Sequence, residues 1–214
     1  MVGQPRFFAT GIYIMKNNME FDYQSRYPTS PNRSAMKDIL VPPMLAALVQ
    51  ASLSACDGAV FSCRESCPDC GGKLSGYDTK KKKFAVIRDK TQNKTISVQV
   101  KRYTCQTCGI ICFANQPFYP GTRIGSPVID LCVTLGETMP YSRVSAYLDH
   151  MGIVVDRWSV RNYHRNTENK VPTVDMFGIR LPMTIISLSV LAAQCRNGID
   201  TEKILAACRY PSNQ

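Results

Sequence analysis

Histidines and acidic residues are scarce in this sequence, and familiar catalytic motifs are missing. The 214 residues include two histidines, His150 and His164, which stand apart and lack metal-ligand spacing. The sequence has no phosphate-binding glycine loop, no nucleophile elbow and no convincing acid dyad. These absences argue against an enzyme, unless a partner chain supplies the catalytic groups.

Uncharged runs of membrane-span character are also missing. Ile39–Cys56 has 18 residues without a charge, but two prolines interrupt it. We therefore expect a buried helix from about Pro43 to Cys56 and no membrane partner. Phe7–Met15 is apolar, yet no small-residue cleavage site follows it, so we expect no targeting segment. The expected location is the cytoplasm, where reducing conditions disfavour disulfides.

Acidic residues are too few to balance the basic ones, and the excess is local. The chain has 26 lysines and arginines against 16 acids, a net charge of +10. Residues 73–103 hold ten of these bases against Asp78 and Asp89, which leaves +8 in this stretch. Such a patch attracts polyanions, of which nucleic acid is the commonest large one. A solubilising surface hairpin is the alternative. The expected phosphate contacts are Lys80, Lys81, Lys82 and Lys83.

Cysteine is abundant, and four of the ten cysteines form two Cys-x-x-Cys knuckles, each followed by glycine. Two intervening residues let one tight turn aim both sulfurs at a single ion at ~2.3 Å. The glycines after Cys70 and Cys108 permit the positive φ that such a turn needs. The predicted ligands of a structural Zn²⁺ are Cys67, Cys70, Cys105 and Cys108. Four thiolates leave no open position for water, so we expect no hydrolysis there.

Two other interpretations of the knuckles remain open. A rubredoxin-like iron centre uses related knuckles, although electron transfer does not need a lysine run. Two disulfides would suit an oxidising compartment better than the expected cytoplasm. Cys63 and Cys112 flank the knuckles and are interpreted as buried or incidental cysteines.

A β-hairpin is predicted between the knuckles. Phe84–Ile87 has the composition of a short strand, and Thr95–Lys101 alternates apolar and polar residues as a half-buried strand does. Asp89–Lys94 is the expected polar connection. With the knuckles, this hairpin predicts a zinc ribbon over residues 63–112, preceded by an N-terminal linker and helix over residues 1–62.

Helices are predicted after a linker over Phe113–Gly125. One begins with Ser126 as N-cap, a second runs from about Ser142 to Gly152, and a third begins at Asp156 and runs toward Arg165. The second and third have the plan of a helix-turn-helix within residues 126–166. A helical hairpin buried in a core is the alternative. With Val160 and Tyr163 facing the core, the expected DNA contacts are Arg157, Ser159, Arg161, Asn162 and Arg165. Ser159 would meet a phosphate.

Two further helices, about Pro182–Cys195 and Thr201–Cys208, are predicted within residues 171–214. The expected fold class is therefore α+β: a small zinc-ribbon β-hairpin, an all-α helix-turn-helix unit and a C-terminal helical pair. A homodimer through the C-terminal helices is left open.

Residues 63–166 resemble the N-terminal DNA-binding region of insertion-sequence transposases from archaea and bacteria, which commonly place a Cys-x-x-Cys ribbon before a helix-turn-helix. The residues that carry the resemblance in the second part are Ser142, Arg143, Val144, Leu148, Gly152, Ile153, Val155, Asp156, Ser159, Val160 and Tyr163. Such transposases also need a long Asp-Asp-Glu catalytic domain, whereas 44 residues follow Lys170 here. The resemblance implies a truncated or solo transposase-like module that binds double-stranded DNA in the nucleoid. A zinc-ribbon transcription regulator and a protein-interaction adaptor are the alternatives.

Overall fold

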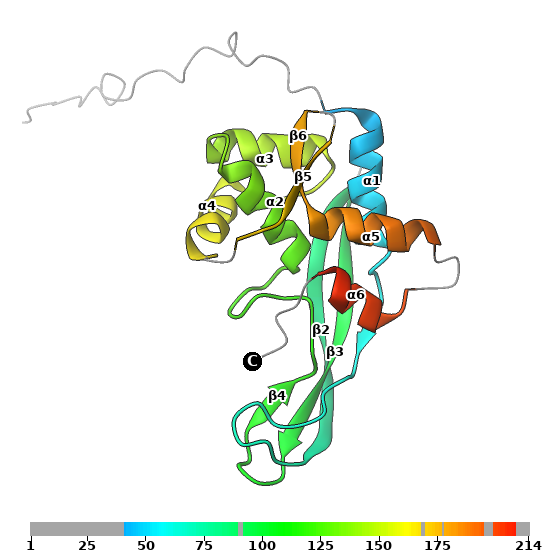
Figure 1. Cartoon of the computed structure of the whole chain (residues 1–214), viewed down its shortest axis with the longest axis vertical. Coiled ribbons are helices and arrows are strands. Elements are labelled where there is room, and N and C mark those ends of the chain that lie inside the picture. The colour runs from blue at the N-terminus through cyan, green and yellow to red at the C-terminus, as the bar shows by residue number, and fades with distance from the viewer. Residues whose placement is uncertain (1–40, 90–91, 168–169, 177, 195–198, 209–214) are drawn as a thin grey trace, which may run out of the picture. The chain divides into compact units, whose positions relative to one another are not determined.

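The chain has a mixed α+β fold, as the sequence predicts (Figure 1). The computed structural model describes residues 41–89, 92–167, 170–176, 178–194 and 199–208, all of which belong to one unit, residues 38–214. Within these described residues there are six helices and two sheets. No helix in the described part of the chain is long and apolar enough to cross a membrane.

The larger sheet is built around one central strand, β3 (Gln92–Cys105). Strand β2 (Leu74–Asp89) pairs with it antiparallel along one edge. On the other edge, β1 (Val60–Phe61) pairs parallel and β4 (Ile111–Phe113) antiparallel. The alternation predicted for β3 is confirmed, because the side chains buried from solvent are Ile96, Val98 and Val100.

Strands β2 and β3 are longer than the sequence predicts. We expected Phe84–Ile87 and Thr95–Lys101, but the strands extend to the two cysteine knuckles. From Leu74 to Lys83 most side chains are exposed, so burial imposes no alternation on this half of β2. Pairing with β3 forms this half nonetheless. Of the expected connection, residues 92–94 belong to β3, and residues 90–91 lie outside the described residues.

Helix α1 (Pro43–Ser54) and helix α5 (Met183–Gln194) pack against each other and against the shared core. In α1 the spacing of Leu45, Val49 and Leu53 puts all three side chains on one face, and all three are fully buried. The helix is where the sequence predicts it, but it ends at Ser54 and only one of its faces is buried, since Met44 and Ala51 are exposed. Helix α6 (Thr201–Ala207) follows, capped by the side chain of Asp200.

Helix α2 (Ser126–Gly136) is buried on every side. The helical repeat predicts one apolar face made of Val128, Leu131, Cys132 and Leu135. These four side chains are buried, but so are the remaining residues from Ser126 to Leu135. The predicted N-cap was wrong: Gly125 occupies that position, and Ser126 begins the helix with Pro127 in its first turn. Contacts with helices on several sides account for this burial.

A small hairpin in the C-terminal segment escaped prediction. Strands β5 (Thr173–Met176) and β6 (Ile179–Pro182) pair antiparallel, and Gly178 adopts a φ of 75° at their turn. Pro182 therefore ends a strand, and α5 begins one residue later than predicted. Each strand has four residues, too few for a periodic signal.

The β2–β3 hairpin is joined to the turn between helix α3 (Tyr141–His150) and helix α4 (Arg157–Asn166). The N–H of Arg88 donates to the carbonyl of Gly152 at 2.8 Å, and the N–H of Val154 donates to the carbonyl of Val86 at 2.9 Å. The Arg88 guanidinium also makes a two-pronged ion pair with Asp149, at 2.8 and 2.9 Å. Figure 1 shows the hairpin passing from the knuckles to these helices. Residues 63–112 and 126–166 therefore share backbone hydrogen bonds; their boundaries as domains stay a prediction.

Candidate metal centre and candidate nucleic-acid interface

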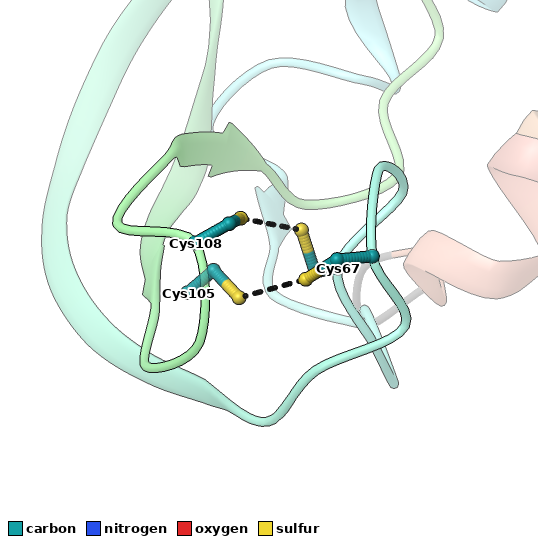
Figure 2. A group of neighbouring side chains, drawn as sticks. Cys67, Cys105 and Cys108 are labelled. Atoms are coloured by element: carbon teal, nitrogen blue, oxygen red, sulfur yellow. Dashed lines mark hydrogen bonds between the residues drawn. The ribbon is translucent and has the colours of Figure 1, made fainter.

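Four cysteine side chains converge where the hairpin ends at Leu74 and Cys105, away from the end that meets the α3–α4 turn. Figure 2 shows three of them, Cys67, Cys105 and Cys108, pointing toward one another. The sulfurs of Cys67, Cys70, Cys105 and Cys108 all lie within 4.8 Å of one another. The Cys67 and Cys108 sulfurs are 3.7 Å apart, and those of Cys70 and Cys105 are 3.4 Å apart. All four are free thiols, so the two-disulfide interpretation does not describe this arrangement. The predicted four-cysteine cluster is confirmed.

The two knuckles have the same backbone geometry. The N–H of Gly71 donates to the carbonyl of Cys67, and the N–H of Gly109 donates to the carbonyl of Cys105, both at 3.0 Å. Gly71 and Gly109 have φ values of 69° and 74°, the left-handed conformation predicted for the residue after each knuckle. Each turn thereby aims its two sulfurs into the same space.

The close approach of the knuckles depends on Gly72. A Cβ at this position would lie 2.4 Å from the Thr107 hydroxyl oxygen and 3.1 Å from the Cys105 sulfur. In addition, the N–H of Gln106 donates to the carbonyl of Lys73 at 2.9 Å. The first knuckle therefore touches the second through backbone as well as through sulfur, and a side chain at residue 72 would push them apart.

The cluster stabilises thiolate at Cys105. The backbone N–H of Cys108, together with that of Thr107, lowers the pKa of the Cys105 thiol to about 6. At Cys108 the N–H of Ile110 favours the thiolate, but desolvation and the Cys105 thiol outweigh it and raise the pKa to about 12. Four thiolates this close repel one another, so a cation among them is needed for all four to ionise together.

The spacing of the sulfurs fits a tetrahedral metal site. In a tetrahedron with metal–sulfur bonds of ~2.3 Å, sulfurs lie ~3.8 Å apart. The observed 3.4 and 3.7 Å are close to that value. Cys63 and Cys112 lie outside this set: Cys63 is exposed, and Cys112 is buried in β4. Among the described residues, the group that could hold a metal ion therefore consists of these four cysteines.

Three of the four predicted phosphate-binding lysines, Lys80, Lys81 and Lys83, are exposed on β2. Lys82 is different, because its ammonium lies 4.1 Å from the centre of the Phe118 ring and donates to the Gln116 side chain at 2.9 Å. Burial lowers the pKa of Lys82 below its ordinary value, and the neighbouring charge of Lys80 adds to this. Lys80 pairs with Val100 and Lys82 with Val98, so both lie on the same side of the sheet, and it is the cover by Phe113, Gln116 and Phe118 that buries Lys82.

Other cations of the basic stretch are paired with acids. Arg88 binds Asp149, and Lys94 binds Asp57. Two guanidinium nitrogens of Arg102 bind the two carboxylate oxygens of Asp78. The excess charge of residues 73–103 is therefore smaller at the surface than the sequence suggests. Six lysines of this stretch make no ion pair among the described residues, namely Lys73, Lys80, Lys81, Lys82, Lys83 and Lys101. Three of them, Lys80, Lys81 and Lys83, lie exposed within four positions of β2.

Helices α3 and α4 lie where the sequence predicts a helix pair. Gly152, with a φ of 77°, follows the end of α3, and the Asp156 carboxylate caps α4 by accepting from the Ser159 N–H at 3.0 Å. Val160 is fully buried and Tyr163 packs partly against the core, as expected. The opposite side of α4 is left to solvent.

Three arginines follow one face of α4 at four-residue spacing. Arg157 and Arg165 are exposed, and Arg161 is half-buried, with its guanidinium 5.3 Å from the centre of the Trp158 ring. Together with two residues of α3 they line a cavity of about 340 Å³, which we name the arginine groove: Tyr141, Ser142, Arg157, Trp158, Arg161 and Arg165. No ion pair within the described residues engages these arginines.

Two other predicted contacts differ from expectation. The Ser159 hydroxyl donates to the Asp156 carboxylate at 2.6 Å, so a phosphate would have to displace that carboxylate to receive the same proton. Asn162 does not line the arginine groove. It lines a second cavity of about 630 Å³, the tyrosine cleft, between α4 and the loop after β4: Tyr119, Pro120, Gly121, Thr122, Arg123, Asn162, Tyr163, Asn166 and Thr167.

Sequence reasoning missed Trp158 as a partner of Arg161 and the loop 119–123 as a cleft wall. The sequence carries little signal for either, because side chains of distant segments meet only in the fold. Of the two histidines, His164 has its ring Nδ1 3.4 Å from the Tyr141 hydroxyl and lies against Gly136, and His150 is the last residue of α3.

A scan against protein-family models and searches of curated proteins and of solved structures found no match to the chain.

Proposed function

We propose that the chain is a DNA-binding protein, a solo or truncated transposase-like module, without a catalytic role of its own. The observation that carries the proposal is the arginine groove. It offers three arginines at four-residue spacing on one helix face, and no ion pair among the described residues neutralises them. An arginine guanidinium can donate two hydrogen bonds to the edge of a guanine or to a phosphate, so such a helix face suits a DNA groove.

In this proposal α3 and α4 act as a helix-turn-helix, with α4 as the helix that enters the major groove. The buried side chain of Val160 and the Asp156 cap fix the rotation of α4, so that the arginines face outward. The backbone hydrogen bonds between β2 and the α3–α4 turn hold this pair against the hairpin. Such preorganisation lowers the entropy lost on binding.

Zinc is the metal we propose for the four-cysteine cluster, with iron as the chemical competitor. Both ions accept four thiolates at similar distances, but a basic DNA-binding ribbon requires no redox centre. A bound zinc would be structural, and Cys67, Cys70, Cys105 and Cys108 would hold it. Its binding free energy would stabilise the knuckle end of the hairpin, where few apolar side chains are buried.

Recovery of genomic DNA tests the proposal directly. The purified, metal-loaded chain is expected to retain duplex fragments at low ionic strength, and sequencing of these fragments should reveal a preferred site. Association in the nucleoid would follow from the same affinity. A chain that retains no duplex at low salt would overturn the proposed function.

The exposed lysines of β2 are expected to add affinity without sequence preference. Changing Lys80, Lys81 and Lys83 to glutamine should weaken binding to all duplexes alike. It should also reduce the slope of log affinity against log salt by about one for each phosphate that the variant no longer neutralises. Titrations of a preferred and an unrelated duplex at several salt concentrations measure both effects.

Lys82 provides a matched control on the same strand. Because its ammonium lies over Phe118 and donates to Gln116, Lys82→Gln should lower the melting temperature while leaving the salt slope nearly unchanged. If the triple variant instead changed which sequence is preferred, the exposed lysines would not be simple phosphate contacts.

A further inference from the structure

The tyrosine cleft has the size and the walls of a ligand site. Its volume of about 630 Å³ lies in the range of pockets that hold small organic molecules. Among the residues that the structure describes, its lining includes two tyrosines, one arginine and two asparagines, but no acid. Tyrosine rings stack on bases, arginine binds phosphate, and an asparagine amide can donate to and accept from one base edge.

The loop wall of the cleft is held in place before any ligand arrives. The Thr122 N–H donates to the Tyr119 carbonyl at 3.1 Å, with Pro120 and Gly121 between them and a φ of 71° at Gly121. This is the hydrogen bond and the glycine conformation of a type II turn. The Thr122 hydroxyl donates to the same carbonyl at 2.7 Å.

Tyr119 is anchored at its far end by a buried acid. Its hydroxyl donates to the Asp130 carboxylate at 2.6 Å, and Asp130 is 1% exposed in the middle of α2. Burial, followed by the charge of Asp130 and this hydrogen bond, raises the pKa of Tyr119 above its ordinary range, so the hydroxyl keeps its proton. The tyrosine therefore presents a fixed, neutral wall to the cleft and leaves its hydroxyl unavailable to a ligand.

The other wall belongs to α4, the helix that carries the arginine groove. Asn162 follows Arg161 directly in the chain, yet Asn162 lines the cleft and Arg161 lines the groove. Asn166, one turn after Asn162, lines the cleft as well. One helix thus separates a face rich in arginine from a pocket suited to a single base and its phosphate.

We propose that the tyrosine cleft holds one unpaired nucleotide of the DNA whose duplex lies along α4. This inference rests on the proposed function and extends it: the preferred substrate is a duplex with a flipped, mismatched or overhanging nucleotide. The base lies against Tyr119 and Tyr163, Asn162 and Asn166 meet its edge, and Arg123 meets its phosphate. An unpaired nucleotide avoids most of the cost of unstacking and unpairing, so such DNA binds more tightly than the blunt duplex.

The test compares two DNA molecules of the same sequence, one fully paired and blunt, the other with a single unpaired nucleotide. The full chain should bind the second about tenfold more tightly, the order of one base stacked on an aromatic side chain. Arg123→Ala and Asn166→Ala should each reduce this affinity ratio toward one. Arg161→Ala is the matched control: it should weaken binding to both DNA molecules and leave the ratio unchanged.

The outcomes separate the two proposals. Equal affinity for the two DNA molecules, or a ratio that Arg123→Ala and Asn166→Ala leave intact, would overturn the cleft assignment while duplex binding stands. Failure to bind either DNA would count against the proposed function instead. In that case the cleft is tested with free 5′-dAMP by backbone amide NMR: shifts confined to the cleft residues would support a nucleotide site, and no shift there would end the proposal.

Discussion

Replacing Cys105 with serine is expected to remove the bound metal and to unfold the knuckle end of the hairpin. Cys105 is 1% exposed, and its sulfur lies 3.4 Å from that of Cys70 and accepts from the Thr107 N–H. A serine hydroxyl does not ionise at neutral pH, so three thiolates would remain where four are required. Because metal binding and folding of such a ribbon are coupled, loss of the ion should cost several kcal/mol of local stability.

Elemental analysis and hydrogen exchange measure this result together. The unaltered chain should contain one zinc per molecule, and Cys105→Ser should contain much less. Amide exchange should accelerate over residues 67–76 and 103–113, while amides of the buried strand segment around Val98 stay protected. Cys63→Ser is the matched control, since Cys63 is an exposed cysteine outside the cluster and its loss should leave the zinc content unchanged.

Two results would contradict this interpretation of the cluster. Iron with a visible charge-transfer band in the freshly purified chain would identify a redox centre. Full zinc content in Cys105→Ser, with unchanged exchange over both knuckles, would mean that Cys105 is not required to hold the ion.

The parts of the structure that sequence predicted best are those in which local chemistry decides. Each Cys-x-x-Cys-Gly turn brings its own two sulfurs together because the turn is fixed by its own backbone hydrogen bond and its glycine. Asp156 caps α4 because its carboxylate accepts from an N–H three residues on. Val160 is buried because the helical repeat puts it on the core side. None of these outcomes needs knowledge of a distant segment.

The parts that sequence did not predict depend on which distant segments meet. Lys82 is one lysine in a run of four, yet its ammonium is held by Gln116 and Phe118, which come from the segment after β4. The half of β2 from Leu74 to Lys83 lacks an apolar alternation because its side chains are mostly exposed. The tyrosine cleft likewise needs a loop and a helix that lie far apart in the chain.

The junction between hairpin and helices has a consequence for the proposed DNA binding. Residues on both sides of the Ile87–Ile153 bridge exchange backbone hydrogen bonds, and Gln50 from α1 donates to the Met151 carbonyl at 3.0 Å. The α3–α4 turn is thus tied to a strand and to a helix outside the pair. Movement of α4 independently of β2 would break these bonds, so the exposed lysines of β2 and the arginines of α4 belong to elements held in a fixed relative position.

Removing the arginines of α4 is expected to have the largest effect on DNA affinity. Arg161→Ala should cost ~1–3 kcal/mol on the preferred site and much less on unrelated DNA, because the guanidinium can hold one base edge with two hydrogen bonds. Its position over Trp158, 5.3 Å from the ring centre, restricts the side chain before binding. Changing Arg157, Arg161 and Arg165 together to alanine should abolish measurable preference and lower the salt slope further. Competition titrations against an unrelated duplex measure the two effects separately.

The fold should survive these changes, and that makes the experiment decisive. The arginine side chains make no ion pair with the described residues, so circular dichroism and the melting temperature should stay close to those of the unaltered chain. Arg180→Ala is the matched control: Arg180 is an exposed arginine on β6 that lies 3.7 Å from Glu137 and outside the arginine groove. Its loss removes one positive charge, as Arg161→Ala does, and should leave site preference intact. If the triple variant kept full affinity and preference, α4 would be an ordinary core helix with a solvated basic face, and the DNA-reading role would have to be sought elsewhere on the chain.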